Sequence, residues 1–63
     1  MIKAYDIVKS AKALGKRVPK GCKGTVVIVY PDFPTAFEVE FVDDNFETLE
    51  ILTVSSDEII LAN

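Results

Sequence analysis

Two segments rich in strand-forming residues, joined by a proline-containing turn, constrain the fold of this chain more than any other feature. The first runs from Lys20 to Tyr30 (KGCKGTVVIVY), and the second covers residues 37–41 (FEVEF). β-Branched and aromatic residues favour strands, whereas the two prolines within residues 31–34 are excluded from a central strand and so mark a turn. The pair therefore predicts a β-hairpin at the centre of a small β-barrel.

The alternation of apolar and charged residues predicts which side chains face the barrel interior. Apolar residues occupy every second position of residues 37–41, so Glu38 and Glu40 are expected on the outer face. Further strands are expected at residues 49–54, with Glu50 outward, and at 58–61. In the turn at 43–45, Asn45 is expected to adopt a positive φ. The predicted core comprises Val27, Val29, Phe37, Val39, Phe41, Leu49 and Ile51.

The first segment of the chain is compatible with two interpretations. Alternation around residues 5–9 favours a strand, whereas Ile7, Ala11 and Leu14 share one face of a helix that Gly15 would end. We favour the strand, with one helical turn after it left open, and then a loop over residues 16–23. Five short strands in 63 residues predict a single all-β domain, residues 1–63, folded as a small five-stranded SH3-like barrel.

A series of short motifs spans nearly the whole chain: Tyr5-Asp6-Ile7-Val8, Lys20-Gly21-x-x-Gly24-Thr25-Val26-Val27, Tyr30, Phe37-Glu38-Val39-Glu40-Phe41-Val42-Asp43, Thr48-Leu49 and Leu52-Thr53. This series resembles a bacterial family known as domain of unknown function 4926. The resemblance implies an SH3-like barrel, similar to those of the nitrile hydratase β-subunit and of KOW modules, without an established activity. It also implies a loose association of some members with toxin-like partners. The chain departs from the family pattern at Asn45-Phe46, where glycine is frequent, and at Phe33, which lengthens the preceding turn.

Charge is divided sharply along the chain. All seven basic residues lie within residues 1–23, which carry a net charge of +6, whereas residues 24–63 carry −9. This division favours a basic loop on one side and an acidic sheet face on the other, each able to attract a partner. Because 49% of the residues are hydrophobic in a chain with a thin interior, we also expect some apolar surface to remain exposed for contacts.

Catalysis and metal binding have little support in this sequence. It has no histidine, the usual general base and metal ligand near neutral pH, so the single cysteine, Cys22, has no orienting base. Residues 43–47 cluster acidic oxygens but lack the loop length and glycine of a calcium-binding loop. Gly21 and Gly24 lack the spacing of a phosphate-binding loop and are assigned to turn geometry. We therefore expect no enzymatic activity, no catalytic residues, no metal and no cofactor.

The sequence favours a small protein-binding module. The expected contacts are the aromatic residues of the turns and the acids of the outer face: Tyr30, Phe33, Phe46, Glu38, Glu40 and Glu50. A specific version is an antitoxin- or immunity-type protein whose acidic face covers a basic partner.

Two alternatives to this function stay open. A KOW-like barrel would bind nucleic acid through its basic loop, although the acidic pI of about 4.7 disfavours this. A self-assembling barrel would pair copies through an edge strand. The single cysteine favours a reducing compartment, and the charges of Lys3, Asp6 and Lys9 do not fit a signal peptide, so we expect a cytoplasmic location. No apolar stretch has membrane-spanning length, so no membrane partner is expected.

Overall fold

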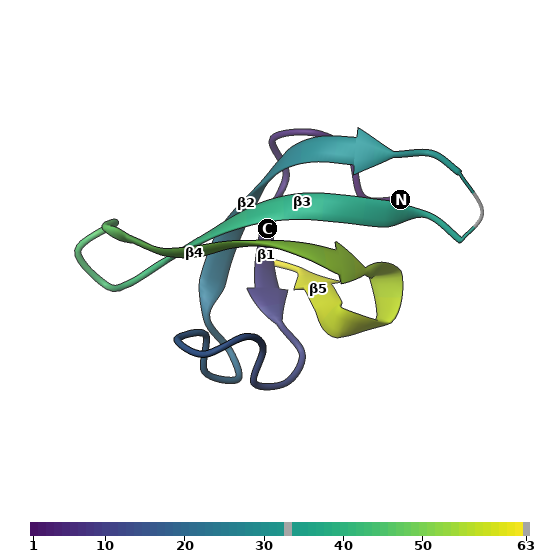
Figure 1. The fold of residues 1–63 in the computed structure, drawn as a ribbon. Coiled ribbons are helices and arrows are strands. Elements are labelled where there is room, and N and C mark those ends of the chain that lie inside the picture. Colours follow the sequence, from purple (N-terminus) through teal and green to yellow (C-terminus); the bar gives the residue numbers. More distant parts are fainter. Residues whose placement is uncertain (33, 63) are drawn as a thin grey trace.

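The computed structural model describes residues 1–32 and 34–62, and in these residues the strands form one antiparallel sheet. The elements are β1 (Ile7–Ser10), β2 (Lys23–Tyr30), β3 (Ala36–Val42), β4 (Thr48–Ser55), the 3₁₀ helix η1 (Ser56–Glu58) and β5 (Ile59–Leu61). The five strands follow the order β4-β3-β2-β1-β5 across the sheet (Figure 1). The predicted fold class is confirmed as an all-β fold of five antiparallel strands in a small barrel. In this described part of the chain, no helix is long and apolar enough to cross a membrane.

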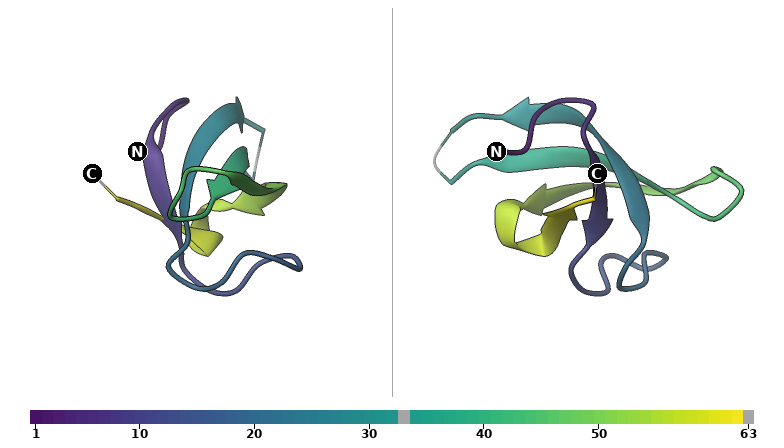
Figure 2. Two further views of the ribbon diagram at one scale, coloured as in Figure 1. Left: turned by 90° about the vertical axis from the view of Figure 1, so that its left-hand side faces the viewer. Right: turned by 180° about the vertical axis from the view of Figure 1, so that it is seen from behind.

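β2 connects the two halves of the barrel. Near its start Thr25 lies opposite Ile7 of β1, and the strand then continues along β3 until Tyr30 lies opposite Ala36. Figure 2 shows these two halves. β1 and both chain ends lie on one side of the molecule, whereas β3 and β4 lie on the other. The hydrophobic side chains of the two halves meet between these layers.

The first segment is a strand, and the helical alternative is wrong. β1 begins two residues later than predicted because Tyr5 has a φ of 71°, a left-handed conformation, in a turn between Lys3 and Asp6. The Asp6 N–H donates to the Lys3 carbonyl (3.1 Å), and the Lys3 N–H donates to the Asp6 carboxylate (2.8 Å). After β1 the chain forms a small hairpin in which Leu14 pairs with Val18, and both side chains reach back into the core.

The interior face of β3 agrees with the alternation in the sequence. Its three apolar residues are buried together with residues of the other strands and of the first loop: Val8, Leu14, Val18, Cys22, Val26, Phe37, Val39, Phe41, Val54 and Ile59. Three other residues of the predicted core, Val27, Val29 and Leu49, are half-buried. The prediction for Ile51 is wrong, because its side chain is 56% exposed.

A β-bulge explains why the prediction for β4 is out of phase. Phe41 of β3 lies opposite Glu50, whereas the next residue of β3 lies opposite Thr48, so Leu49 is the extra residue of the bulge. Opposite residues of an antiparallel pair lie on the same face. Beyond the bulge the inward positions are therefore 50, 52 and 54, and Ile51 points outward.

A second bulge changes the phase of β2. Val26 lies opposite Val39 and Ile28 lies opposite Glu38, which leaves Val27 as the extra residue. Val26 is consequently buried, whereas Ile28 lies on the outer face beside Glu38 and is exposed. The outer face of β2 is therefore uncovered at Ile28.

Candidate interaction groove

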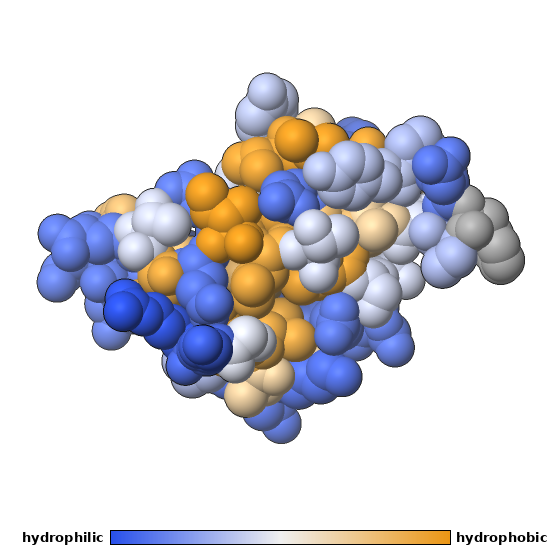
Figure 3. Space-filling model, viewed as in Figure 1, coloured by the Kyte–Doolittle hydropathy of each residue, from blue (hydrophilic) through white to orange (hydrophobic). Residues whose placement is uncertain are grey.

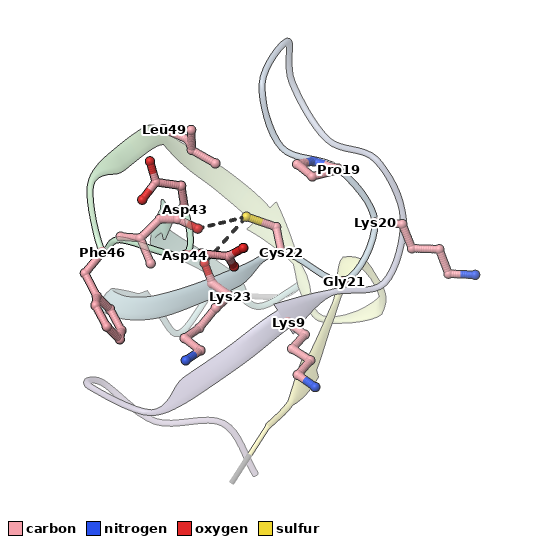
Figure 4. A pocket seen from close by; sticks show the side chains of 11 residues that line it. Lys9, Pro19, Lys20, Gly21, Cys22, Lys23, Asp43, Asp44, Phe46 and Leu49 are labelled. Atoms are coloured by element: carbon pink, nitrogen blue, oxygen red, sulfur yellow. Dashed lines mark hydrogen bonds between the residues drawn. The ribbon is translucent and has the colours of Figure 1, made fainter.

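A groove lies between the loop that precedes β2 and the turn that joins β3 to β4. It has a volume of about 390 Å³. Three lysines, two aspartates and several less polar residues line it: Lys9, Lys20 and Lys23; Asp43 and Asp44; Pro19, Gly21, Cys22, Val42, Phe46 and Leu49. In Figure 4 the side chains of Lys9 and Lys23 extend to the same side, whereas Lys20 points away from the groove. Both signs of charge therefore border a partly apolar floor.

A buried serine fixes the loop wall of this groove. Ser10 Oγ donates to the Pro19 carbonyl (2.6 Å) and accepts the N–H of Cys22 (2.9 Å). The Ser10 backbone N–H donates to the Cys22 carbonyl, and its carbonyl accepts the N–H of Gly21, both at 2.9 Å. Gly21 permits this path because its φ is 84°, a conformation that glycine adopts without a Cβ clash. Ser10 thus anchors the loop wall of the groove to β1.

The other wall is a hairpin turn in which Asp43 satisfies most of the backbone. Its N–H donates to the Glu47 carbonyl (2.9 Å), and its carbonyl accepts the N–H of Phe46 (3.0 Å). Its carboxylate accepts the N–H groups of Asn45 (2.8 Å) and Glu47 (3.0 Å). Such a turn ends with a left-handed residue, which here is Phe46 with a φ of 63°. The prediction that Asn45 takes the positive φ is therefore wrong by one residue.

Phe46 combines two unfavourable features at the edge of the groove. Its side chain is 71% exposed, and its backbone occupies a conformation that glycine normally supplies. The Lys23 ammonium lies 5.1 Å from the centre of the Phe46 ring, within the range of a cation–π interaction. The ring is thus held outward at the edge of the groove beside a positive charge.

Cys22 lies in the floor of the groove as a buried, free cysteine. Burial raises the pKa of the Cys22 thiol, and its Sγ donates a hydrogen bond to the Val42 carbonyl (3.2 Å). A raised pKa leaves less of the reactive thiolate at neutral pH. Within residues 1–32 and 34–62, no group of three His, Cys, Asp or Glu side chains is arranged to hold a metal ion.

The predicted acidic contacts divide between two places. Glu38 and Glu40 lie on the outer face of β3, as predicted, and accept hydrogen bonds from the hydroxyls of Thr53 and Thr48. Glu50 does not join them, because the bulge at Leu49 turns it to the inner face. Only the first two acids thus form the outer acidic pair predicted from the sequence.

The aromatic residues predicted as contacts also do not share one site. Phe46 belongs to the groove, Tyr30 is a partly exposed residue at the end of β2, and Phe33 lies outside the described residues. The role of Lys9 in lining the groove was not predicted from the sequence. The pairing of Lys9 with Lys23 would have placed Lys9 there, but it requires the register of β1 on β2.

Glu50 instead stabilises the loop after β1. Its Oε1 accepts the backbone N–H groups of Lys16 (2.9 Å) and Arg17 (2.7 Å). We expect Glu50→Ala to lower the free energy of unfolding by about 1 kcal/mol, because both bonds to a charged acceptor are lost at a solvent-accessible site. Urea denaturation followed by circular dichroism measures this change. Glu47→Ala, which removes an exposed carboxylate, is the control, and an equal effect of both substitutions would contradict the role of Glu50.

Comparison with known protein families identifies the group to which the chain is related. The model of the family described as Domain of unknown function (DUF4926) matches residues 4–61. The chain therefore belongs to this family, as its spaced glycine and FEVEF motifs indicated. No curated protein and no solved structure matches the chain.

Proposed function

We propose that this member of the DUF4926 family is a small, non-catalytic protein-binding module whose contact surface is centred on Phe46 and the adjoining groove. The observation that carries the proposal is the exposed ring of Phe46 at the edge of the groove, beside the Lys23 ammonium. Its left-handed backbone adds to the cost of this placement in the isolated chain, and such outliers cluster at functional sites. Tyr5 shares the exposure and the left-handed backbone but lies outside the groove, so its position is what distinguishes Phe46.

The lining of the groove supports a protein as the partner. Protein surfaces present charges of both signs together with apolar side chains, and aromatic residues contribute strongly to binding at their centres. The groove offers Lys9 and Lys23 on one side, Asp43 and Asp44 on the other, and Phe46 at its edge. It can therefore accept acidic, basic and apolar side chains of one partner.

The finer form of the proposal is an antitoxin- or immunity-type role in the cytoplasm. The acidic pair Glu38 and Glu40 on the outer face of β3 and the net charge of −3 support a basic partner protein. Charges of opposite sign around an interface accelerate association. In this form the acidic pair attracts the partner, and Phe46 provides the close contact.

The test compares Phe46→Gly with wild type in capture of proteins from a native lysate of the source organism. We expect captured protein to fall at least tenfold, because loss of a central aromatic contact costs about 2 kcal/mol or more. The free energy of unfolding should stay within about 1 kcal/mol of wild type. Glycine at this position removes the strain of a side chain on left-handed backbone, about 1–2 kcal/mol. This gain offsets the lost cation–π contact of about 0.5–1 kcal/mol and the added entropy of the unfolded chain.

Tyr5→Gly is the matched control. It also removes an exposed aromatic ring from a left-handed position, but Tyr5 is not part of the groove lining. We expect this variant to retain full capture. Equal capture by wild type and by Phe46→Gly would refute the proposed contact surface.

Nucleic acid is a second candidate partner, favoured by one observation. Lys9 and Lys23 border the same groove as Phe46, and lysines beside an exposed aromatic ring are the elements of a single-strand binding site. Asp43 and Asp44 in the same lining oppose it, because they repel phosphates. Capture repeated after nuclease treatment separates the candidates, since a protein held through nucleic acid is lost and a direct partner is retained.

A further inference from the structure

Lys9 and Lys23 form a pair of like charges that the fold does not neutralise. They lie directly opposite each other on the antiparallel strands β1 and β2, so their side chains share one face of the sheet, and both are exposed. Within residues 1–32 and 34–62 the one salt bridge joins Lys12 to Glu58, so neither ammonium group of this pair is ion-paired. Like charges directly opposite each other destabilise a sheet. The pair therefore costs stability in the isolated chain.

The two aspartates of the groove leave this charge in place. The Asp43 carboxylate accepts N–H groups of its own turn. In the part of the chain that the structure describes, neither aspartate forms an ion pair with either lysine. The Lys23 ammonium instead lies over the Phe46 ring, a contact that attracts the charge but does not cancel it. Both lysines are therefore available to an acidic group from outside the chain.

An apolar side chain lies at each end of the lysine pair. On the other side of β1, Ile60 of β5 lies opposite Lys9 and is 58% exposed. Beyond Lys23, the exposed Phe46 ring completes a row that we call the lysine strip: Ile60, Lys9, Lys23 and Phe46. Figure 3 also shows hydrophobic surface over the middle of the molecule, where β4 crosses this view. The lysine strip is more selective, because two charges of one sign between its apolar residues specify the charge of a ligand.

The spacing of the lysine strip fits an extended peptide. Neighbouring strands lie about 4.8 Å apart, so the midpoint between the two lysines lies about 7 Å from Ile60 across the sheet. Alternate side chains of an extended chain point the same way and also lie about 7 Å apart. A carboxylate at this midpoint is thus two residues from an apolar side chain beside Ile60. An apolar side chain two residues further along reaches the side of Phe46.

We propose that the lysine strip binds an extended acidic segment of the partner protein, in which an apolar side chain lies two residues to each side of a carboxylate. The two flexible lysine side chains converge on the carboxylate, while Ile60 and Phe46 pack against the apolar side chains. This inference rests on the proposed function and defines the chemistry of the segment that the groove receives. The acidic pair on β3 lies outside the strip and can still attract basic groups of the same partner.

The surroundings of the strip favour an acidic peptide over nucleic acid. A single carboxylate needs only the two lysines. A chain of phosphates would also approach Asp43 and Asp44 in the same groove, and the net charge of −3 would repel it.

The test follows backbone amide shifts by NMR while the isotope-labelled protein is titrated with the capped peptides GLSESLG and GLSQSLG. We expect saturable shifts of the strip residues with GLSESLG. The dissociation constant of GLSQSLG should be about tenfold higher, because contacts to both lysines are lost. Lys9→Gln and Lys23→Gln should each weaken binding of GLSESLG by about threefold. The double variant Lys9→Gln/Lys23→Gln should bind both peptides equally.

Lys3→Gln and Lys16→Gln are the controls, since each removes one exposed positive charge outside the strip and should leave the dissociation constant unchanged. The double variant of the strip should melt no lower than wild type, because it removes a pair of like charges. Equal affinity of wild type for the two peptides would overturn the proposal. Shifts of the strip residues with oligothymidylate but not with GLSESLG would overturn it in favour of nucleic acid.

Capture from lysate separates failure of this inference from failure of the proposed function. Capture that is lost in Phe46→Gly but retained in Lys9→Gln/Lys23→Gln would overturn the acidic segment and leave the proposed contact surface intact. Capture retained in both variants, together with binding of GLSESLG that depends on its glutamate, would refute the proposed contact surface. The preference of the strip for an acidic segment would then stand.

Discussion

Phe41→Ala is expected to lower the free energy of unfolding by about 3–5 kcal/mol, an amount close to the whole stability of a domain of this size. Phe41 has no exposed surface and lies on the inner face of β3, between Gly24 on one side and Glu50 on the other. Its removal leaves a cavity within the cluster of buried side chains that forms the core. Most of the variant should consequently be unfolded near room temperature.

Thermal and urea denaturation followed by circular dichroism measure this loss. Phe46→Ala is the matched control, because it deletes the same atoms from an exposed site and should change stability by less than about 1 kcal/mol. A Phe41→Ala variant that melts within a few degrees of wild type would show that the inner face of β3 has been assigned to the wrong residues.

The inner face of β3 could be predicted from the sequence because its pattern is uninterrupted. Charged and apolar residues alternate from Phe37 to Phe41, and the strand carries no bulge within these positions. β4 shows the opposite case. Its bulge at Leu49 depends on how β4 meets β3, a non-local contact that leaves no mark in the alternation of residues 49–54. The alternation therefore predicts the wrong faces for Glu50 and Ile51.

The candidate groove was only partly predictable for a similar reason. Phe46 was identified as an aromatic residue in a turn, where no strand pattern buries it. Its partners Lys9 and Lys23 come from strands that are distant in sequence, and the two walls meet where Cys22 donates to the Val42 carbonyl. The residue types of the turn also point to the wrong position. Asn45 is the residue that tolerates a positive φ, yet Phe46 is the residue that adopts it. Phe46 therefore occupies a backbone conformation that its residue type disfavours.

Gly24→Ala is expected to lower the free energy of unfolding by about 1–3 kcal/mol, through overpacking rather than through turn strain. The prediction that Gly24 serves turn geometry is wrong, because Gly24 lies within β2, opposite Val8 on one side and Phe41 on the other. A Cβ at this position would lie 2.7 Å from Val39 Cγ1, 2.9 Å from Phe41 Cδ1 and 3.2 Å from the Glu40 carbonyl oxygen.

The neighbours of Gly24 have no space into which they can move, since Val39 and Phe41 are fully buried and the third contact is backbone. A double-mutant cycle with Val39→Ala distinguishes overpacking from a backbone effect, because it removes the closest of the three atoms. We expect the double variant to be more stable than the sum of the single losses by about 1 kcal/mol, within the usual range for residues in contact. Additive losses of stability in urea denaturation would instead assign the effect to the backbone of β2. In that case the close approach of the β3 side chains would not explain why glycine is required at position 24.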